Sequence, residues 1–320
     1  MRSTTFAAGR SAEALGQSRR SGDARERTPR HPSEIARSAE RSRSSPTTGW
    51  VTFAAVNVER RPVARALTIA GSDPSGGAGL QADLKTFHQH GVYGAAVVSL
   101  LTVQNTVAVT RVEPLAADLV RAQLEAVLTD VRPSAVKTGA LGSAAVIEAV
   151  ADARITAPLV VDPVLISKHG HTLVTDDART ALVTKLLPLA LLVTPNAHEA
   201  EALAGAPITS LDDAAAAAEA IARLGARAVL VKASRLEGPE AVDVLYHEGR
   251  VRQFAAPRVP SRHVHGSGCS YSAAITAGLA KGAALEEAIA AAKAWMSRAI
   301  ARAPDIGDGL GPIDHLTPIG

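Results

Sequence analysis

The chain has one cysteine, Cys269, and it lies in a run whose residue types could bind an anion and move a proton. In His265-Gly266-Ser267-Gly268-Cys269-Ser270, two glycines precede a long stretch of small residues that predicts a helix. Backbone N–H groups at a helix start are open to an anion such as a phosphate, and the helix dipole favours negative charge there. The same setting lowers a thiol pKa from about 8.5 toward the physiological range, so Cys269 is a candidate base or nucleophile. A small buried thiol without a chemical role is the alternative.

A second glycine-rich loop, Gly71-Ser72-Asp73-Pro74-Ser75-Gly76-Gly77-Ala78-Gly79, follows the first predicted strand and opens a helix. Ligands of open α/β sheets bind outside the carboxyl ends of the strands, where this loop would lie. The loop spells neither the G-x-G-x-x-G dinucleotide fingerprint nor the G-K-[ST] ending of a P-loop. The loop therefore argues against hydride transfer and against a Walker-type ATPase. It could still bind a different ligand, or it could be a simple tight turn.

Polar residues also follow other predicted strands. Asn196-Ala197-His198-Glu199 starts a helix, and by itself this spacing predicts a helix cap with a capping-box partner. Thr194 and Lys232 lie at the ends of two consecutive predicted strands.

From residue 66 onward, apolar runs alternate with stretches of helical periodicity, which is the pattern of βαβ units. An aromatic content of only 3% and the abundance of Ala, Val and Leu favour helices packed closely on a parallel sheet. The predicted class is α/β, with a mostly parallel central sheet flanked by helices on both faces. Strands are predicted at 66–70, 94–101, 135–137, 159–161, 191–193 and 229–231, helices at 79–90, 116–130, 212–224, 269–281 and 285–303, and an edge β-hairpin at 242–246 and 251–254.

The charge is distributed unevenly along the chain. Residues 1–64 contain twelve Arg, no Lys and six acidic residues, a formal charge of +6 that leaves −3 for residues 65–320. Their Arg-, Ser- and Pro-rich composition predicts a disordered extension. It would be upstream sequence translated from a misassigned start, with the real protein beginning near Val56 or Val58, or else a transit peptide or a regulatory tail. The acidic balance of residues 65–320, the predicted catalytic domain, argues against nucleic-acid binding.

The composition also bounds the cellular setting. The chain is 47% apolar but has no run of about 18 consecutive apolar residues, so a membrane span is not predicted. A single cysteine cannot form an intramolecular disulfide, as small secreted scaffolds require. We therefore expect a soluble, cytoplasmic protein without a membrane partner.

Several separated motifs, in order, resemble those of hydroxymethylpyrimidine/phosphomethylpyrimidine kinase of thiamin biosynthesis, a family with a ribokinase-like fold. They are the first glycine loop with Gln81-Ala82-Asp83-Leu84-Lys85-Thr86, Val103-Gln104-Asn105-Thr106, the His-Gly-Ser-Gly-Cys run, and Gly309-Leu310-Gly311-Pro312. The resemblance covers residues 65–320. It implies an ATP- and Mg²⁺-dependent kinase that phosphorylates 4-amino-5-hydroxymethyl-2-methylpyrimidine and then its monophosphate, and it allows a monovalent-cation requirement.

The resemblance also implies a pyrimidine site. Gln104 would orient the ring, because its amide both donates and accepts, as a ring nitrogen beside an exocyclic amine requires. Asp83 would accept from the amine or hold the substrate end, unless it is only a carboxylate in the first turn of a helix. Gly71 and Val164 would line the pocket, and Ala140 stands where many relatives have Met, which leaves room for a looser fit.

At the phosphate end, the resemblance implies that Glu199 and Asp162 bind magnesium, for which one or two carboxylates suffice because the ion keeps several waters. Glu199 would belong to the N-x-x-E motif of ribokinase-like enzymes. The nucleotide would be bound by Thr194, Asn196 and Lys232, with Lys137 and Lys168 as weaker candidates.

The resemblance gives Cys269 a role as the base that removes the proton of the hydroxymethyl group while its oxygen attacks the γ-phosphate. Sugar kinases of the same fold have Asp at this place. The backbone N–H groups of Gly266, Ser267 and Gly268 would hold the transferring group. Phosphoryl transfer depends chiefly on positioning and charge stabilisation, so these groups are expected to matter at least as much as the thiol.

Two alternative functions stay open at this point. Pyridoxine or pyridoxal kinase has the same fold and a similar heterocyclic alcohol as substrate, although Gln104 favours the aminopyrimidine. A non-catalytic heterocycle-binding regulatory protein, with the basic tail on nucleic acid, is disfavoured by Cys269, Glu199 and the glycine turn. The resemblance further predicts a homodimer.

Overall fold

The computed structural model describes residues 62–165 and 175–320. The expected extension, apart from residues 62–64, and the weak candidate Lys168 lie outside the described residues. Within them, no helix is long and apolar enough to cross a membrane.

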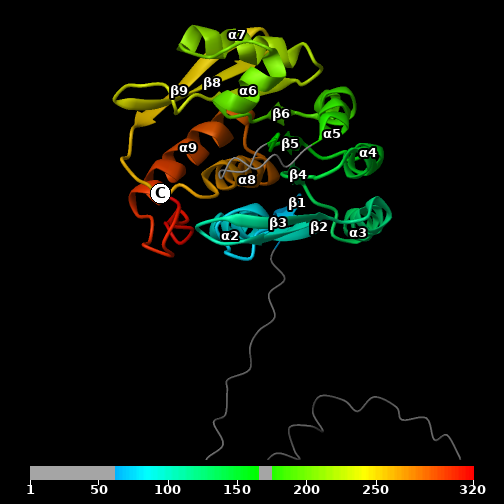
Figure 1. Cartoon of the computed structure of the whole chain (residues 1–320). Coiled ribbons are helices and arrows are strands. Elements are labelled where there is room, and N and C mark those ends of the chain that lie inside the picture. Colours follow the sequence, from blue (N-terminus) through cyan, green and yellow to red (C-terminus); the bar gives the residue numbers. More distant parts are fainter. Residues whose placement is uncertain (1–61, 166–174) are drawn as a thin grey trace, which may run out of the picture. The chain divides into compact units, whose positions relative to one another are not determined.

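The described strands form one nine-stranded sheet in the order β3-β2-β1-β4-β5-β6-β7-β8-β9 (Figure 1). The strands from β2 through β1 and β4 to β7 pair in parallel, whereas β3, β8 and β9 pair antiparallel with their neighbours. The predicted, mostly parallel sheet is therefore confirmed. The strands are β1 (Arg65–Ser72), β2 (Tyr93–Gln104), β3 (Val109–Pro114), β4 (Ala135–Thr138), β5 (Leu159–Val161), β6 (Leu192–Val193), β7 (Ala228–Lys232), β8 (Glu240–His247) and β9 (Arg250–Pro257).

Helices cover both faces of the sheet, as predicted (Figure 1). Alternate residues of a buried strand point to opposite faces. In β7, Val229 and Val231 join the apolar core that includes α3 to α7, whereas Ala228 and Leu230 join the core of α8 and α9. The helices are α2 (Gly79–Gln89), α3 (Ala117–Asp130), α4 (Ala144–Asp152), α5 (Asp176–Ala181), α6 (Ala197–Ala204), α7 (Leu211–Ala222), α8 (Ser267–Ala280) and α9 (Leu285–Ala301), with short π and 3₁₀ turns at Leu182–Leu186 and Leu187–Leu189.

The helix α8 is apolar or small on every side, and most of its residues are buried. It packs against α2 and α9 and also touches β1, β4 and β5. A helix without a polar face belongs in the interior of a protein. Its N-terminus therefore starts inside the molecule, next to the central strands.

The two edges of the sheet differ from each other in how well they were predicted. The hairpin of β8 and β9 is confirmed. The strand β3 was not predicted, because in this short strand only Val109 is buried and no apolar period stands out. Pairing with β3 extends β2 from the predicted end at residue 101 to Gln104, with a bulge between Val103 and Gln104.

Candidate active site

A cavity lies between the two glycine-rich segments and the ends of the central strands. Gly71 and Ser72 end β1, Asp73 follows it, and Gly266, Gly268 and Cys269 lie at the start of α8. The cavity wall contains most of the predicted site residues, namely Gly71, Gln104, Ala140, Asp162, Val164, Asn196, Glu199, Lys232, Gly266, Gly268 and Cys269. Asp83, Thr194 and Ser267 are not part of this wall.

The two glycine segments interlock, which explains why they are rich in glycine. Gly266 precedes α8 with φ +71°, and a Cβ there would lie 1.8 Å from the carbonyl oxygen of Gly77. Gly79 has φ +55°, and a Cβ there would lie 2.3 Å from the carbonyl oxygen of Gly71. Glycine alone accepts both the positive φ and the close approach. Gly79 therefore lets the first loop fold back on itself, and Gly266 lets the two distant loops come into contact.

The first turn of α8 presents backbone N–H groups to the cavity, but not the set that was predicted. The Ser267 N–H donates to the carbonyl oxygen of Val264 at 3.2 Å, so its expected place in an anion cradle is corrected. Gly268 and Cys269 follow in the same turn, where N–H groups have no acceptor within the helix. A Cβ on Gly268 would lie 3.3 Å from Nζ of Lys232, so a cation stands close to the helix start.

The predicted lowering of the Cys269 pKa is wrong, because the net shift is upward. Burial raises the pKa of the Cys269 thiol to about 11, and the carboxylates of Asp83 and Asp162 act in the same direction. The charge of Lys137 lowers this pKa, but by less. Desolvation disfavours the charged thiolate more than the Lys137 charge and the Gly79 backbone hydrogen bond favour it. Without a ligand, the thiol is therefore protonated at neutral pH.

Asp83 is not a substrate ligand on the cavity surface, nor does it lie in the first turn of α2. Its side chain is fully buried and forms an ion pair with Lys137, with 2.9 Å between Oδ2 and Nζ. Thr68 donates its hydroxyl to the same oxygen at 2.6 Å. Burial lowers the pKa of Lys137, but the negative charges of Asp83, Cys269 and Asp162, together with the hydrogen bond to Asp83, outweigh burial and raise it. The predicted direct contacts of Asp83 with substrate and of Lys137 with nucleotide are therefore corrected to a buried pair.

Asp162 connects several elements at the other side of the cavity. Its Oδ1 accepts hydrogen bonds from Lys232 Nζ at 3.0 Å and Thr194 Oγ1 at 3.2 Å, and its Oδ2 accepts from Ser272 Oγ at 3.3 Å. Burial raises the pKa of Asp162, but Lys232 and Lys137 more than compensate and lower it. Asp162 therefore carries a negative charge. Thr194 is fully buried and its hydroxyl binds Asp162, so its contact with nucleotide phosphates stays a prediction.

Asn196 and Glu199 form the capping box that the spacing alone predicts, and both also line the cavity. Asn196 Oδ1 accepts from the Glu199 N–H at 3.0 Å, and Glu199 Oε2 accepts from the Asn196 N–H at 2.8 Å. Burial raises the pKa of Glu199 to about 7, although Lys232 partly offsets burial. This carboxyl group is therefore close to half-ionised at neutral pH and would gain from a nearby cation.

The wall formed by β1, β2 and β4 is largely apolar or small. Gly71 is close to β2, because a Cβ there would lie 2.5 Å from Leu100 Cδ1. The carbonyl oxygen of Ala140 accepts a hydrogen bond from Ser99 Oγ at 2.6 Å, which fixes the segment after β4. Gln104 and Thr102 add polar groups from β2. A flat heterocycle with a few polar substituents suits such a wall.

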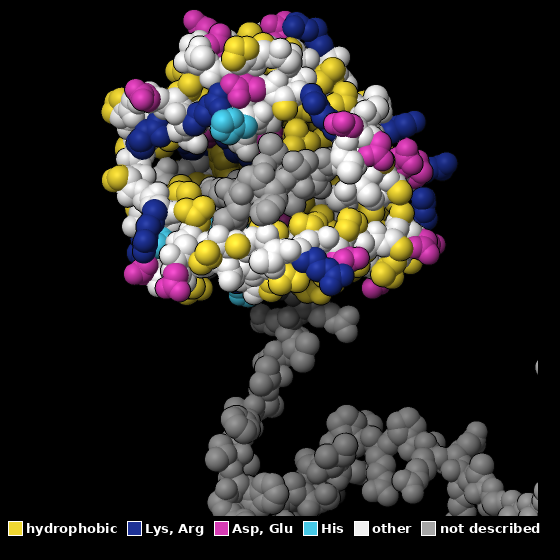
Figure 2. Space-filling view, viewed as in Figure 1, with side chains coloured by type: hydrophobic (Ala, Val, Ile, Leu, Met, Phe, Trp, Pro, Cys, Tyr) yellow, Lys and Arg dark blue, Asp and Glu magenta, His cyan; other side chains and the backbone are white. Residues whose placement is uncertain are grey.

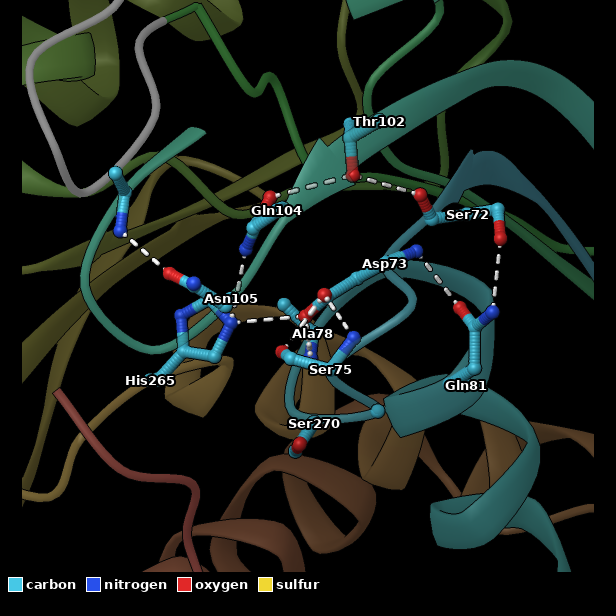
Figure 3. A network of polar contacts seen from close by, with 12 residues as sticks. Ser72, Asp73, Ser75, Ala78, Gln81, Thr102, Gln104, Asn105, His265 and Ser270 are labelled. Atoms are coloured by element: carbon cyan, nitrogen blue, oxygen red, sulfur yellow. Dashed lines mark hydrogen bonds and ion pairs between the residues drawn. The ribbon is translucent and has the colours of Figure 1, made fainter. Parts of the chain in front are cut away.

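Asp73 and His265 are site residues that the sequence reasoning did not single out. Both line the cavity, and they join the first glycine loop to the segment before α8 (Figure 3). Asp73 begins an Asp-Pro-Ser-Gly turn, a pattern in which the carboxylate often binds nearby backbone N–H groups. That signal could have indicated the importance of Asp73 for the loop.

The C-terminal Gly309-Leu310-Gly311-Pro312 motif connects the end of β2 to the segment before α8. The Leu310 N–H donates to the carbonyl oxygen of Thr106 at 2.8 Å, and the His265 N–H donates to that of Gly311 at 3.1 Å. A Cβ on Gly309 would lie 2.1 Å from the Thr106 carbonyl oxygen, so glycine is needed there. The motif holds both sides of the cavity together.

The surface charge on the viewed face is mixed. Figure 2 shows Lys and Arg side chains interspersed with Asp and Glu side chains around the described part of this face. Residues 65–320 carry a formal charge of −3. Nucleic-acid-binding surfaces need clustered positive charge, so this face gives no support to that function.

A family model and curated relatives agree on one family. Residues 73–314 match the family model described as phosphomethylpyrimidine kinase. A hydroxymethylpyrimidine/phosphomethylpyrimidine kinase of Rhizobium meliloti (strain 1021) is 49% identical over 257 residues, which cover 78% of this chain and 96% of that protein. The kinase of the same name from Bacillus subtilis (strain 168) is 41% identical over 256 residues, covering 79% and 94%.

Solved structures are also similar. A phosphomethylpyrimidine kinase from Clostridium difficile 630 has a TM-score of 0.66 and 41% identity, covering 74% of this chain and 99% of that one. An ADP complex of a pyridoxal kinase from Bacillus subtilis has a TM-score of 0.73 and 38% identity, covering 80% and 98%.

Proposed function

The chain belongs to the phosphomethylpyrimidine kinase family, and on that premise we propose that it transfers the γ-phosphoryl group of ATP to 4-amino-5-hydroxymethyl-2-methylpyrimidine. A second transfer to the monophosphate gives the diphosphate used in thiamin biosynthesis. Residues 65–320 form the kinase domain.

One observation carries this proposal. A single cavity contains both an amide suited to a heterocycle, Gln104, and a cationic group at a helix start, Lys232 beside Gly268. The first matches an aminopyrimidine and the second matches the phosphates of a nucleotide. A kinase must hold both partners in line, because most of its catalysis is positioning and charge stabilisation.

Magnesium fits the residues at the phosphate side. Asp162 and Glu199 line the same cavity, and the raised pKa of Glu199 reflects a buried carboxyl group whose charge is incompletely compensated. The described residues contain no group of three or more His, Cys, Asp or Glu that could hold a metal by themselves. Asp162 and Glu199 would therefore share Mg²⁺ with phosphate oxygens and water, as Mg²⁺ commonly requires. When bound, the ion neutralises phosphate charge.

The side chains and backbone groups of the cavity then have separate roles in the reaction. Lys232 and the N–H groups of Gly268 and Cys269 stabilise the transferring phosphoryl group. Cys269, in its thiolate form, accepts the proton of the substrate hydroxymethyl group. Because the thiol is protonated in the ligand-free protein, this step becomes more effective as the pH rises toward the pKa of about 11.

Phosphorylation of pyridoxal or pyridoxine is the second candidate function. The pyridoxal kinases of Bacillus subtilis and Staphylococcus aureus are 38% and 35% identical to this chain and share its fold. Their substrate is also a heterocyclic alcohol that would fit an apolar wall. The relatives named for the pyrimidine substrate are more similar in sequence, at 41% to 49% identity, so the aminopyrimidine is preferred.

The test is an ADP-release assay with the purified full-length chain, ATP and MgCl₂. The substrates are the hydroxymethylpyrimidine, its monophosphate, pyridoxal and pyridoxine. The proposal expects the highest kcat/KM with the hydroxymethylpyrimidine and measurable turnover of its monophosphate. A higher kcat/KM with either vitamer would replace the substrate assignment, and no ADP release with any of them would overturn the function.

We also propose that the kinase is a cytoplasmic homodimer, as expected from the family. Light scattering coupled to size exclusion should give twice the chain mass. A single-chain mass at micromolar concentration would contradict the dimer.

A further inference from the structure

The carboxylate of Asp73 is held rigidly beside the cavity. Its Oδ1 accepts hydrogen bonds from Ser75 N–H at 2.9 Å and Ser75 Oγ at 2.7 Å, and its Oδ2 accepts from Ala78 N–H at 2.8 Å. Burial raises the pKa of Asp73, but hydrogen bonds from His265 and Ser75 outweigh burial and lower it. Asp73 is therefore an ionised acceptor in a fixed position.

His265 faces this carboxylate, and the contact determines where its ring carries hydrogen. The Nε2 atom of His265 lies 2.8 Å from Asp73 Oδ2, and both side chains are about 95% buried. An ionised carboxylate only accepts hydrogen bonds, so Nε2 must carry a hydrogen. The ring also packs on Gly77, where a Cβ would lie 2.4 Å from His265 Cδ2. The ring can therefore not move away without disturbing the glycine loop.

The same ring nitrogen faces Gln104. The side-chain nitrogen of Gln104 lies 3.0 Å from His265 Nε2, and Figure 3 shows the amide between this ring and Thr102. An amide –NH₂ and a protonated Nε2 are both donors and cannot bond to each other. The nitrogen and oxygen of an amide have nearly the same shape, and the hydrogen-bond network decides between them. The network therefore assigns the amide oxygen of Gln104 to the position beside His265, where it shares the single Nε2 hydrogen with Asp73 Oδ2.

Thr102 agrees with this orientation. Its hydroxyl donates to the carbonyl oxygen of Ser72 at 2.9 Å, so toward Gln104 it presents lone pairs. The Gln104 side-chain atom that faces this hydroxyl lies 3.5 Å from Thr102 Oγ1. A hydroxyl whose hydrogen is already used favours an –NH₂ neighbour over a carbonyl oxygen.

We propose that Asp73 and His265 are positioning residues that fix the Gln104 amide with its oxygen on His265 and its –NH₂ beside Thr102, in the cavity wall that both residues line. Gln104 thereby offers the substrate a hydrogen-bond donor, which selects a ring nitrogen with a lone pair over an amine at the same place. This specificity role rests on the proposed function. The position of the hydrogen on the His265 ring does not rest on the proposed function, and it is tested separately.

The first test is a double-mutant cycle with the full-length chain, using His265→Ala, Gln104→Ala and the double variant. His265→Ala should raise the KM for the hydroxymethylpyrimidine about tenfold, the effect of losing one well-oriented hydrogen bond, and leave the KM for ATP within about twofold. In the Gln104→Ala background, His265→Ala should have no further effect on the substrate KM. Equal effects in both backgrounds, or an equal rise in the KM for ATP, would overturn the proposal.

Conservative variants separate positioning from folding. His265→Gln keeps an N–H donor near the Nε2 position and should restore most of the substrate KM, whereas Asp73→Asn removes the charged acceptor and should behave like His265→Ala. Gln123→Ala is the matched control, because Gln123 also binds β2, at Val98, away from the cavity wall. It should leave the substrate KM unchanged. Failure of His265→Gln to improve on His265→Ala would contradict the donor role.

The second test does not depend on activity. ¹⁵N NMR of histidine-labelled protein at pH 7, with His265→Gln to assign the signal, should show His265 protonated at Nε2. Protonation at Nδ1 alone would overturn the inference even if the enzyme proves to be a pyrimidine kinase. Nε2 protonation together with no turnover of the pyrimidine would instead reject the function and keep the positioning pair.

Discussion

Lys232 Nζ lies 3.0 Å from Asp162 Oδ1, and both groups lie next to Gly268 in the first turn of α8. The two residues come from the ends of β7 and β5, and they meet at the start of a buried helix. A cation, a carboxylate and helix N–H groups are thus assembled at one point. This is a suitable place for a phosphate together with a divalent cation.

Gly268→Ala tests whether that point binds the nucleotide. The added Cβ would lie 3.3 Å from Lys232 Nζ, a tight contact that would make the cation shift by a few tenths of an ångström. We expect the KM for ATP to rise roughly tenfold. The thermal midpoint should not fall, because Ala suits a helix better than Gly.

Gly278→Ala in the same helix is the control for Gly268→Ala, because the opposite result is expected from it. Its Cβ would lie 2.9 Å from Ala288 Cβ in α9, so this variant should lose stability and keep the KM for ATP. If both variants changed KM and stability together, Gly268 would have only a packing role.

Cys269 can be titrated directly, because it is the only cysteine of the chain. With a thiol pKa of about 11, the rate of alkylation by iodoacetamide should rise about tenfold per pH unit between pH 7 and 10. The measurement is mass spectrometry of the ligand-free protein over time. A rate that levels off near pH 8 would show that the helix start does lower this pKa.

Cys269→Ala tests the proposed proton transfer. We expect kcat to fall by roughly 10²- to 10⁴-fold, the usual contribution of a general base, while the Kd for ADP stays within about twofold. Steady-state kinetics and calorimetry measure the two quantities. A kcat close to that of the unmodified sequence would remove the thiol from the mechanism and leave positioning as the main source of catalysis.

The buried pair of Asp83 and Lys137 should show opposite effects on the thiol. Lys137→Met removes a cation and should raise the pKa of Cys269, whereas Asp83→Asn removes an anion and should lower it. Each single variant leaves a buried charge unpaired and should cost about 3–5 kcal/mol in urea unfolding. The double variant should be more stable than Lys137→Met alone. Shifts of the same sign in both single variants would contradict the electrostatic link.

Glu199→Gln should gain stability relative to the unmodified sequence as the pH rises. Glu199 has a pKa of about 7 in the folded chain against an ordinary value of 4.5. Folding therefore favours the neutral form of Glu199. The stability that this gives the folded chain is fully present below pH 4.5 and is lost as the pH increases through 7. The difference amounts to at most about 3 kcal/mol. Gln keeps the capping-box geometry, so the cap itself should survive.

The measurement is urea unfolding of both proteins at pH 5, 6, 7 and 8. A stability difference that is flat across this range would contradict the raised pKa. The same pair of proteins reports on magnesium, because MgCl₂ with ADP should raise the thermal midpoint of the unmodified sequence more than that of Glu199→Gln. Equal rises would remove Glu199 from the magnesium site.

Local patterns were sufficient for most of the architecture. The alternation of apolar runs and helical periods correctly predicted the parallel strands, the helices on both faces and the β8–β9 hairpin. The motifs in order pointed to the ribokinase-like fold and the family, which the comparisons confirm. The edge strand β3 was missed because a short, mostly exposed strand has no distinctive period.

The sequence predicted cavity residues that lie at or near the ends of predicted strands. Gly71, Gln104 and Lys232 lie at the ends of strands, and strand ends meet at one edge of a parallel sheet. Asp83 and Thr194 lie outside the cavity wall, and their side chains bind Lys137 and Asp162, residues 54 and 32 positions away in the chain. Such partners are determined by packing and not by sequence spacing.

By itself, the sequence determined the fold, the family and the order of the motifs, because periodicity and turn chemistry act between near neighbours. Only the tertiary structure decided the protonation of Cys269 and the contact between Asp73 and His265, which are 192 residues apart. The physical reason is that desolvation and ion pairing depend on everything within a few ångströms of a group. A helix start near Cys269 is visible in the sequence, whereas the burial that outweighs it is not.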